Sequence, residues 1–193
     1  MMEILYLDRD LAVCVKPVGL DSEHEVPQAL KDALGGEIFP IHRLDKNVGG
    51  VMIYARTKSA AAALSKLVQD GALVKEYVAM VHGTPPERGD WEDLLFKDSG
   101  KNKVFVVKKE RKGVKKARLE FVTLAPSLVR IRLHTGRSHQ IRVQFSSRGF
   151  PLQGDHKYGA RDEMKAPMLF SCCITFPWKG REMRFEQLPE WAN

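Results

Sequence analysis

One carboxylate among arginines and glycines is the strongest chemical signal in this chain. Residues 42–50 read HRLDKNVGG and place Asp45 two positions after Arg43, and residues 133–143 read LHTGRSHQIRV and add Arg142. An ionised acid is costly to remove from water unless it is paired. Arg43 and Arg142 are therefore the expected counter-ions of Asp45, and the pattern indicates a functional acid rather than a core residue.

The two runs resemble the signatures of the RluA family of pseudouridine synthases, which are approximately HRLDxxTSG and TGRTHQIRVH. Three further blocks extend the resemblance in family order: residues 15–20 (VKPVGL), 75–83 (KEYVAMVHG) and 149–159 (GFPLQGDHKYG). Together the five blocks span nearly the whole chain, which makes chance a poor explanation. Two departures, Val48-Gly49 in place of Thr-Ser and Gln144 in place of a histidine, bear on rate and substrate more than on the type of reaction.

The resemblance implies an enzyme that isomerises a uridine of ribosomal or transfer RNA to pseudouridine, by cutting the bond from ribose C1′ to uracil N1 and rejoining C1′ to C5. Asp45 matches the catalytic aspartate, and the sequence leaves open whether it acts as a nucleophile or as a base. Arg142 matches the arginine that pairs with this acid, and Tyr77 matches a tyrosine that stacks on the target uracil. Arg43 resembles the residue that fills the gap left by the extruded nucleotide, or it simply neutralises Asp45.

Further substrate-binding residues follow from the same resemblance. Besides Arg43 they are Lys16, His42, Leu44, Gly136, Arg137, His139 and Gln140. No carboxylate or cysteine is spaced to complete a ligand set with the histidines, so no metal site is expected. The chain has no Gly-rich nucleotide-binding loop, and the resemblance implies no metal, nucleotide or redox cofactor.

Length and composition predict one catalytic domain over residues 1–193. A chain of 193 residues with 44% hydrophobic content can bury the core of a single domain. Three cysteines, two of them neighbours, indicate a reducing compartment. The N-terminus lacks the features of a secretory signal, and the longest uncharged run, residues 166–178, is shorter than the roughly 20 residues that cross a bilayer. We expect a soluble, cytoplasmic protein without the S4 domain common in the family, because the KPVG block begins at Lys16.

Positive charge is concentrated in one segment. Between Lys97 and Arg118 the chain has ten Lys or Arg and two acidic residues, a net +8, whereas the whole chain carries +7. One interpretation is a solvated hairpin whose lysines protect a strand edge. The other is an arm that contacts phosphates, since clustered cations bind nucleic acid by releasing counter-ions. Beside the motifs, RNA is the expected partner, with no membrane and no obligate protein partner.

Periodicity and capping residues predict an α+β fold. The expected strands are residues 3–16, 74–82, 117–124 and 128–134, and the expected helices are residues 27–34, 57–70 and a short one up to Gly149. Ser59 and Ser138 are the predicted caps of the last two helices. This agrees with the fold that the resemblance implies, a mainly antiparallel mixed sheet flanked by helices and loops, with the active cleft across the sheet.

Two alternatives come from other classes. The first is a catalytically degenerate RNA-binding or RNA-remodelling module of the same fold, suggested by the altered loop after Asp45, although Asp45, Tyr77 and Arg142 are all present. The second is a kinase, suggested by His-Arg-Leu-Asp and a following asparagine. It fails because the asparagine spacing is wrong, the Gly-rich loop is missing and the motif comes too early in the chain.

Overall fold

A computed structural model describes residues 2–192 of the chain. These residues form two compact units, one made of residues 2–75 and 170–192 and the other of residues 76–169.

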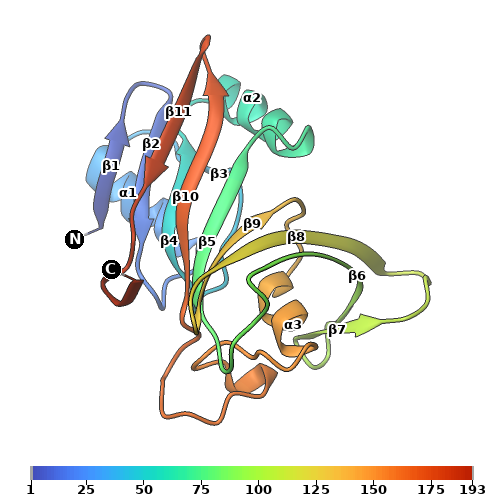
Figure 1. Cartoon of the computed structure of the whole chain (residues 1–193). Helices are drawn as coiled ribbons and strands as arrows, with labels where there is room; N and C mark the ends of the chain where they lie inside the picture. Colours follow the sequence, from blue (N-terminus) through green and yellow to red (C-terminus); the bar gives the residue numbers. More distant parts are fainter. Residues whose placement is uncertain (1, 193) are drawn as a thin grey trace. The chain divides into compact units, whose positions relative to one another are not determined.

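The first unit is built on a mixed sheet with the strand order β1-β2-β4-β10, in which β3 also pairs with β4 and β11 with β10 (Figure 1). The strands are β1 (Glu3–Leu7), β2 (Leu11–Lys16), β3 (Phe39–Pro40), β4 (Gly49–Ala55), β10 (Leu169–Trp178) and β11 (Arg181–Glu186). Neighbouring strands are antiparallel except β4 and β10, which are parallel. Strands β2 and β4 are buried almost throughout, and residues from β2, β4 and β10 form the core of this unit.

Two helices belong to the first unit. Helix α1 (Glu25–Leu34) has Pro27 in its first turn and is followed by Gly35, as predicted. Helix α2 (Lys58–Gln69) places Ala60 and Leu64 in the core. Its cap is Thr57, whose side chain accepts from the backbone N–H of Ala60, so the prediction of Ser59 as the cap was wrong. The cap must precede the first helical residue, and Ser59 already lies inside the helix.

The predicted strand over residues 3–16 is in fact a hairpin of β1 and β2. Asp8 breaks it, because its carboxylate accepts hydrogen bonds from the backbone N–H groups of Asp10 and Leu11, each at 2.7 Å. A short acidic side chain that bonds the backbone two or three residues ahead stabilises a turn.

The second unit carries a sheet with the strand order β5-β9-β8-β6-β7 (Figure 1). Its strands are β5 (Val74–Met80), β6 (Arg88–Asp98), β7 (Lys103–Val107), β8 (Val114–Ala125) and β9 (Leu128–Leu133). Strand β8 is antiparallel to both β6 and β9, and β7 is antiparallel to β6. Strands β5, β8 and β9 confirm three predictions. The 3-10 turns η1 (His156–Tyr158) and η2 (Glu190–Ala192) complete the elements, η1 in this unit and η2 in the first.

Helix α3 (Gln140–Ser146) packs on one face of this sheet. Phe145 of α3 lies with its ring centroid 4.7 Å from Trp91 and 5.2 Å from Phe121. The predicted boundaries of this helix were wrong at both ends. His139, in a left-handed conformation with φ 49°, stands at the N-cap in place of Ser138, and the helix ends three residues before Gly149 because the chain turns at residues 146–149.

Strands predominate in both units, and each unit also has helical segments, so the α+β class and the mainly antiparallel, mixed sheet are confirmed. No helix within residues 2–192 is both long and apolar enough to cross a membrane.

Candidate functional site

In the first unit, the loop that carries Asp45 is fixed by hydrogen bonds from an early segment of the chain. The hydroxyl of Ser22 accepts from the backbone N–H of Leu44 at 3.1 Å and donates to the carbonyl of Leu44 at 2.9 Å. Tyr54 in turn donates to the carbonyl of Ser22 at 2.9 Å, and the N–H of Val48 closes a turn on the carbonyl of Asp45. The backbone on either side of the acid is therefore held in place without the Thr and Ser hydroxyls of the family signature.

Lys16 ties the same loop to the end of β2. Its side chain is fully buried, and its ammonium donates to the carbonyls of Pro17, Leu20 and Lys46 at 3.0, 2.8 and 3.2 Å. An ammonium has three hydrogens to donate, so these carbonyls use all of them. Burial lowers the pKa of Lys16 to about 8, against the opposing effect of nearby carboxylates that include Asp45. Lys16 therefore acts on the loop through its backbone.

Gly50 lies where the loop enters the sheet. Its φ is +130°, and a Cβ there would overlap the backbone of Ser171 on the parallel strand β10. Only glycine fits both the conformation and the close approach. The Gly49-Gly50 pair thus joins the Asp45 loop directly to two neighbouring strands, since Gly50 also lies opposite Lys16 on β2.

The other predicted residues of this loop differ in exposure. The imidazole Nε2 of His42 accepts from the backbone N–H of Ile53 at 3.3 Å, and burial lowers the pKa of this histidine to about 3, so it is neutral. The side chain of Leu44 is buried. Arg43 is more than half exposed and forms an ion pair with Glu23 at 3.0 Å, so its guanidinium remains accessible to a ligand.

In the second unit, Arg142 is buried and held from two directions. Its Nε and Nη2 donate to the two oxygens of Asp155 at 2.6 and 2.8 Å. Its guanidinium carbon lies 5.1 Å from the ring centroid of Tyr158. A bidentate carboxylate fixes the plane of a guanidinium, and an aromatic face adds a cation–π contact. The direction of Arg142 is therefore set before any substrate arrives.

His139 and Tyr158 extend this arrangement. The Tyr158 hydroxyl lies 2.8 Å from Nδ1 of His139 and accepts from the backbone N–H of Val104, also at 2.8 Å. Tyr158 thus links the turn before α3 to strand β7. Tyr77, on β5, is buried.

The turn between β9 and α3 is organised by Gln140. Its side-chain oxygen accepts from the Thr135 hydroxyl and from the backbone N–H of Arg137, and its side-chain nitrogen donates to the carbonyl of Arg118. Gly136 and Arg137 lie at the exposed tip of this turn. Gln140 is buried, so it shapes the turn through contacts within the protein.

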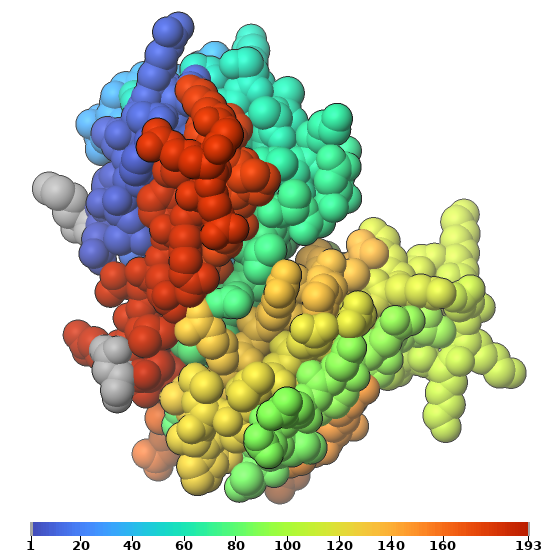
Figure 2. Space-filling view, turned by 45° about the horizontal axis from the view of Figure 1, so that its top comes forward, coloured from blue at the N-terminus to red at the C-terminus, as the bar shows by residue number. Residues whose placement is uncertain are grey.

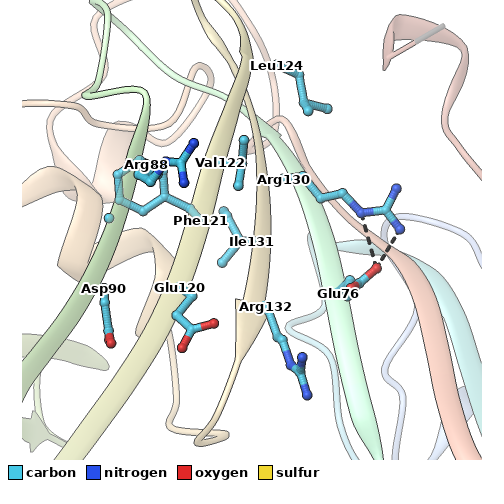
Figure 3. A pocket seen from close by; sticks show the side chains of 11 residues that line it. Glu76, Arg88, Asp90, Glu120, Phe121, Val122, Leu124, Arg130, Ile131 and Arg132 are labelled. Atoms are coloured by element: carbon cyan, nitrogen blue, oxygen red, sulfur yellow. Dashed lines mark hydrogen bonds and ion pairs between the residues drawn. The ribbon is translucent and has the colours of Figure 1, made fainter.

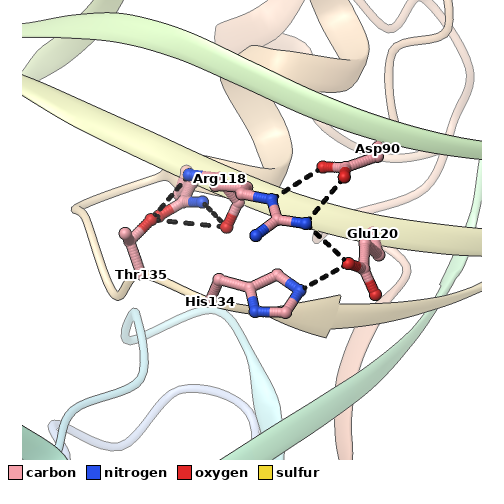
Figure 4. A network of polar contacts seen from close by, with 6 residues as sticks. Asp90, Arg118, Glu120, His134 and Thr135 are labelled. Atoms are coloured by element: carbon pink, nitrogen blue, oxygen red, sulfur yellow. Dashed lines mark hydrogen bonds and ion pairs between the residues drawn. The ribbon is translucent and has the colours of Figure 1, made fainter. Parts of the chain in front are cut away.

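Arg118 joins this turn to the sheet (Figure 4). Its guanidinium donates to both oxygens of Asp90, at 2.9 and 2.7 Å, and to Glu120 at 2.9 Å. His134 also contacts Glu120, with its Nε2 at 3.0 Å from the carboxylate. Because these ion pairs are partly exposed, they add little to stability. They hold side chains of β6 and β8, and His134 at the end of β9, in one network.

A hollow of about 650 Å³ lies over the sheet of the second unit (Figure 3). Val122 and Leu124 expose apolar surface there, and Arg130 pairs with Glu76 at its side. Successive residues of a strand point to opposite faces, so Glu76 and its neighbour Tyr77 face opposite ways. This hollow is therefore on the face away from Tyr77, and its size is no guide to the chemistry.

The basic segment forms the projecting end of the same sheet. Strands β6, β7 and β8 make two successive hairpins there, and the part of the chain near residue 100, yellow-green in Figure 2, extends outward from the rest of the unit. Lys108, Lys109 and Lys112 lie exposed between β7 and β8. An ion pair between Lys116 and Glu110, 3.8 Å apart and highly exposed, leaves most of this charge available.

Three positioning residues were not predicted from the sequence. Ser22 fixes the Asp45 loop, and Asp155 and Tyr158 fix Arg142. Asp155 and Tyr158 lie in the block 149–159 that carries part of the family resemblance, so the signal was present. Ser22 lies outside every block, and no pattern singled it out.

Comparison with known proteins identifies the group to which this chain belongs. Residues 10–147 match the family model of RNA pseudouridylate synthases. The chain therefore belongs to the RNA pseudouridylate synthase family, whose members are isomerases.

Relatives agree with this assignment. An uncharacterized RNA pseudouridine synthase of Aquifex aeolicus is 33% identical over 96% of this chain and 68% of its own length. Ribosomal large subunit pseudouridine synthase D of Zymomonas mobilis is 31% identical over 82% of this chain, which spans only 56% of that relative. tRNA pseudouridine synthase C of Haemophilus influenzae is 31% identical over 90% of this chain and 82% of its length.

Solved structures show the same fold. Human RNA pseudouridylate synthase domain containing 4 matches 98% of this chain and 90% of its own with a TM-score of 0.81 at 24% identity. Human RNA pseudouridylate synthase domain containing 1 matches 98% of this chain and 84% of its own with a TM-score of 0.85 at 22% identity.

Proposed function

We propose that this chain converts specific uridines of ribosomal or transfer RNA to pseudouridine, with Asp45 as the catalytic acid residue. The observation that carries the proposal is the Asp45 loop, which has the family's His-Arg-Leu-Asp sequence in a chain that belongs to the family. Its backbone is fixed on both sides of the acid by Ser22 and Lys16. A preorganised anion is what the reaction needs at the ribose, as a nucleophile or as a base.

Arg142 and Tyr77 are the other proposed catalytic residues. Arg142 is supported by its fixed orientation, because a guanidinium already held by Asp155 and Tyr158 can direct a further hydrogen bond without losing side-chain entropy. Tyr77 is supported by its place in the block 75–83 of the resemblance. This assignment requires residues of both units to act on one uridine, and residues 1–193 then work as a single catalytic domain.

The proposed substrate-binding residues include exposed and buried side chains. Arg43 and Arg137 are exposed, so they are proposed to contact RNA directly, and Arg43 to fill the gap of the extruded nucleotide. Lys16, Leu44 and Gln140 are buried and act through the loops they shape. His42, Gly136 and His139 are included because they lie in the sequence blocks 42–50 and 133–143, which carry the family resemblance. The basic hairpins supply affinity that does not depend on sequence.

The names of two relatives support the proposal that the RNA is ribosomal or transfer RNA. One is named for a ribosomal and another for a transfer RNA activity, so both substrates are candidates. The proposed reaction calls for no metal, nucleotide or redox cofactor. An enzyme that acts on ribosomal or transfer RNA is proposed to work in the cytoplasm, where those RNAs are found.

The test is pseudouridine mapping of total RNA by carbodiimide labelling and primer extension. Cells without the gene are expected to lose one or a few sites, which wild-type chain restores and the Asp45→Asn variant does not. The purified variant is expected to keep RNA affinity within a few-fold of wild type, because the exposed cations are unchanged. Restoration of every site by Asp45→Asn would refute the catalytic role.

The alternative is a catalytically degenerate module that binds or remodels RNA. The observation in its favour is the replacement of the two hydroxyl residues after Asp45 by Val48 and Gly49. It predicts an unchanged pseudouridine map in cells without the gene, together with RNA binding by the purified wild-type chain.

A further inference from the structure

A small notch lies in the second unit beside the tip of the turn at residues 135–140. Its volume is about 150 Å³, and three cationic side chains, from Lys97, Lys115 and Arg137, line it. Leu95 and Val104, both buried, form its base. Among the described residues that line it, none carries a carboxylate. The notch is therefore a concave surface of one charge sign.

Strand register explains why the two lysines share this notch. Leu95 of β6 lies opposite Lys115 of β8, and Lys97 lies two residues from Leu95, on the same face of the sheet. Lys97 and Lys115 are then diagonal neighbours, a relation that places two residues about 7 to 8 Å apart and within reach of long side chains. Like charges held on one face repel each other, so an anion between them would lower the free energy of the pair.

Arg137 closes the notch from the turn. Its Nε donates to the carbonyl of Lys116 at 2.9 Å, and its backbone N–H donates to Gln140 at 3.0 Å, so the side chain is tied to the hairpin and the main chain to the turn. The Nη amino groups suit the oxygens of a phosphate, which arginine binds in a bidentate manner. Gly113 and Gly136, which also line the notch, have no Cβ to block a close approach, and Ser138 adds a hydroxyl.

The size of the notch selects the ligand. Sites for small organic molecules are usually about 300 to 1,000 Å³, so a volume of about 150 Å³ is too small for a nucleoside. A water molecule occupies roughly 30 Å³, and one phosphate group with a few waters fits this space. The geometry and charge therefore match a single phosphate.

We propose that the notch formed by Lys97, Lys115 and Arg137 binds one backbone phosphate of the RNA substrate. The proposal rests on the proposed function for the identity of that RNA. Gln140, which bonds the backbone of Arg137, is also the first residue of α3, the helix that carries Arg142. A phosphate in the notch thereby fixes the register of the RNA relative to Arg142 within one unit, whereas the lysines between β7 and β8 attract RNA without fixing its position.

The direct test is a titration with inorganic phosphate at constant ionic strength, with chloride as the compensating anion, followed by the amide chemical shifts of Gly113, Gly136 and Ser138. Saturable shifts are expected for the wild-type chain and for a control, Lys101→Gln with Lys112→Gln. The shifts are expected to disappear in Lys97→Gln with Lys115→Gln. Both pairs remove the same charge from exposed positions of the same hairpins. Absence of the shifts in the wild-type chain, or their persistence in the notch variant, overturns the proposal.

A second measurement connects the notch to RNA. The dissociation constant of fluorescent transfer RNA is measured across potassium chloride concentrations. Loss of one phosphate contact lowers the slope of log K against log salt by about 0.7 to 0.9. This loss is expected for the notch variant and a smaller one for the control pair; equal losses mean diffuse attraction and overturn the proposal.

Neither readout depends on catalysis, so the two proposals fail separately. A chain that makes pseudouridine but shows no phosphate shifts loses the notch alone. A chain that shows the shifts and the slope difference but makes no pseudouridine keeps the notch and loses the proposed function.

Discussion

At the scale of single residues, the ionisable groups nearest the proposed chemistry are held by the protein itself. Lys16 donates its three ammonium hydrogens to backbone carbonyls, and Arg142 is fixed by Asp155 and Tyr158. Groups oriented in advance need no reorganisation when charge develops in the reaction. The activity is therefore expected to depend on residues that never touch RNA.

Lys16 is expected to impose an alkaline limit on activity near pH 8. Its pKa is lowered from 10.5 to about 8 because burial disfavours the ammonium, and the neutral amine lacks the third hydrogen that the carbonyls require. The single-turnover rate should fall as pH rises through about 8. The Lys16→Met variant should be slower, and its rate should no longer fall above about pH 8. Lys75→Met is the control at another lysine of lowered pKa, and its rate should still fall in that range.

The contribution of Lys16 to stability has the opposite sign. Between about pH 8 and 10.5 the unfolded chain holds the Lys16 proton and the folded chain does not, so the free energy of unfolding gains a positive slope with pH in this window. Urea unfolding at several pH values measures this slope. Lys16→Met should remove the part of the slope that is due to Lys16 and leave the part due to Lys75, whose pKa burial also lowers. If the single-turnover rate and the free energy of unfolding both fell between about pH 8 and 10.5, the group that titrates would not be Lys16.

Asp155 is expected to act as a positioning residue for Arg142. In Asp155→Asn the side chain at position 155 keeps its volume, but Arg142 loses the carboxylate that fixes the plane of its guanidinium. A misplaced catalytic group can cost roughly 100-fold in rate. The variant should lower kcat and leave the RNA dissociation constant nearly unchanged. Tyr158→Phe, which keeps the ring under Arg142 but loses the hydroxyl contacts with His139 and the backbone N–H of Val104, should have a smaller effect. A raised KM with an intact kcat would mean that Asp155 acts on RNA binding instead.

At the scale of elements, the junction between the Asp45 loop and β4 is the most constrained point of the first unit. Gly50→Ala adds a Cβ into the backbone of Ser171 at φ +130°, whereas Gly36→Ala is a matched control with φ +76° and open space around it. Backbone strain alone costs of order 1 to 3 kcal/mol, and overpacking adds about 1 to 3 kcal/mol more. The urea midpoint should fall further in Gly50→Ala, and equal shifts would show that strain alone matters there.

Elements with regular patterns could be predicted from the sequence, and those defined by partners could not. Strand β9 alternates apolar and basic residues, and α2 has four alanines before a terminating glycine, so local physics specifies both. Strand β6 mixes Asp90, Glu92 and Asp93 with apolar residues, and it becomes a strand because β7 and β8 pair with it on both sides. Asp155 lies in a block of the family resemblance, but its contact with Arg142 is a property of tertiary packing that local pattern does not specify.

At the scale of the whole molecule, the chain order of the five blocks was enough to predict the fold class and family, because each block is a local sequence. The strand order within each unit was not predictable, since non-local pairing leaves only a weak trace in one sequence. Local sequence is not enough for the proposed site either, because Asp45 belongs to one compact unit and Arg142 and Tyr77 belong to the other.

Joint action of the two units is expected to appear as strong non-additivity in a double-mutant cycle. Asp45→Glu and Arg142→Lys each keep the charge but alter the geometry, since lysine cannot reproduce the planar fork of arginine. If both residues serve one step, the double variant should be little slower than the worse single variant, because residues that act as a unit lose their contribution together. Asp45→Glu combined with Lys97→Gln is the control, and there the losses in kcat/KM should multiply. The values of kcat/KM for the single and double variants decide the matter. Multiplicative losses for the first pair would show that Asp45 and Arg142 work independently, and the single catalytic domain would then have to be abandoned.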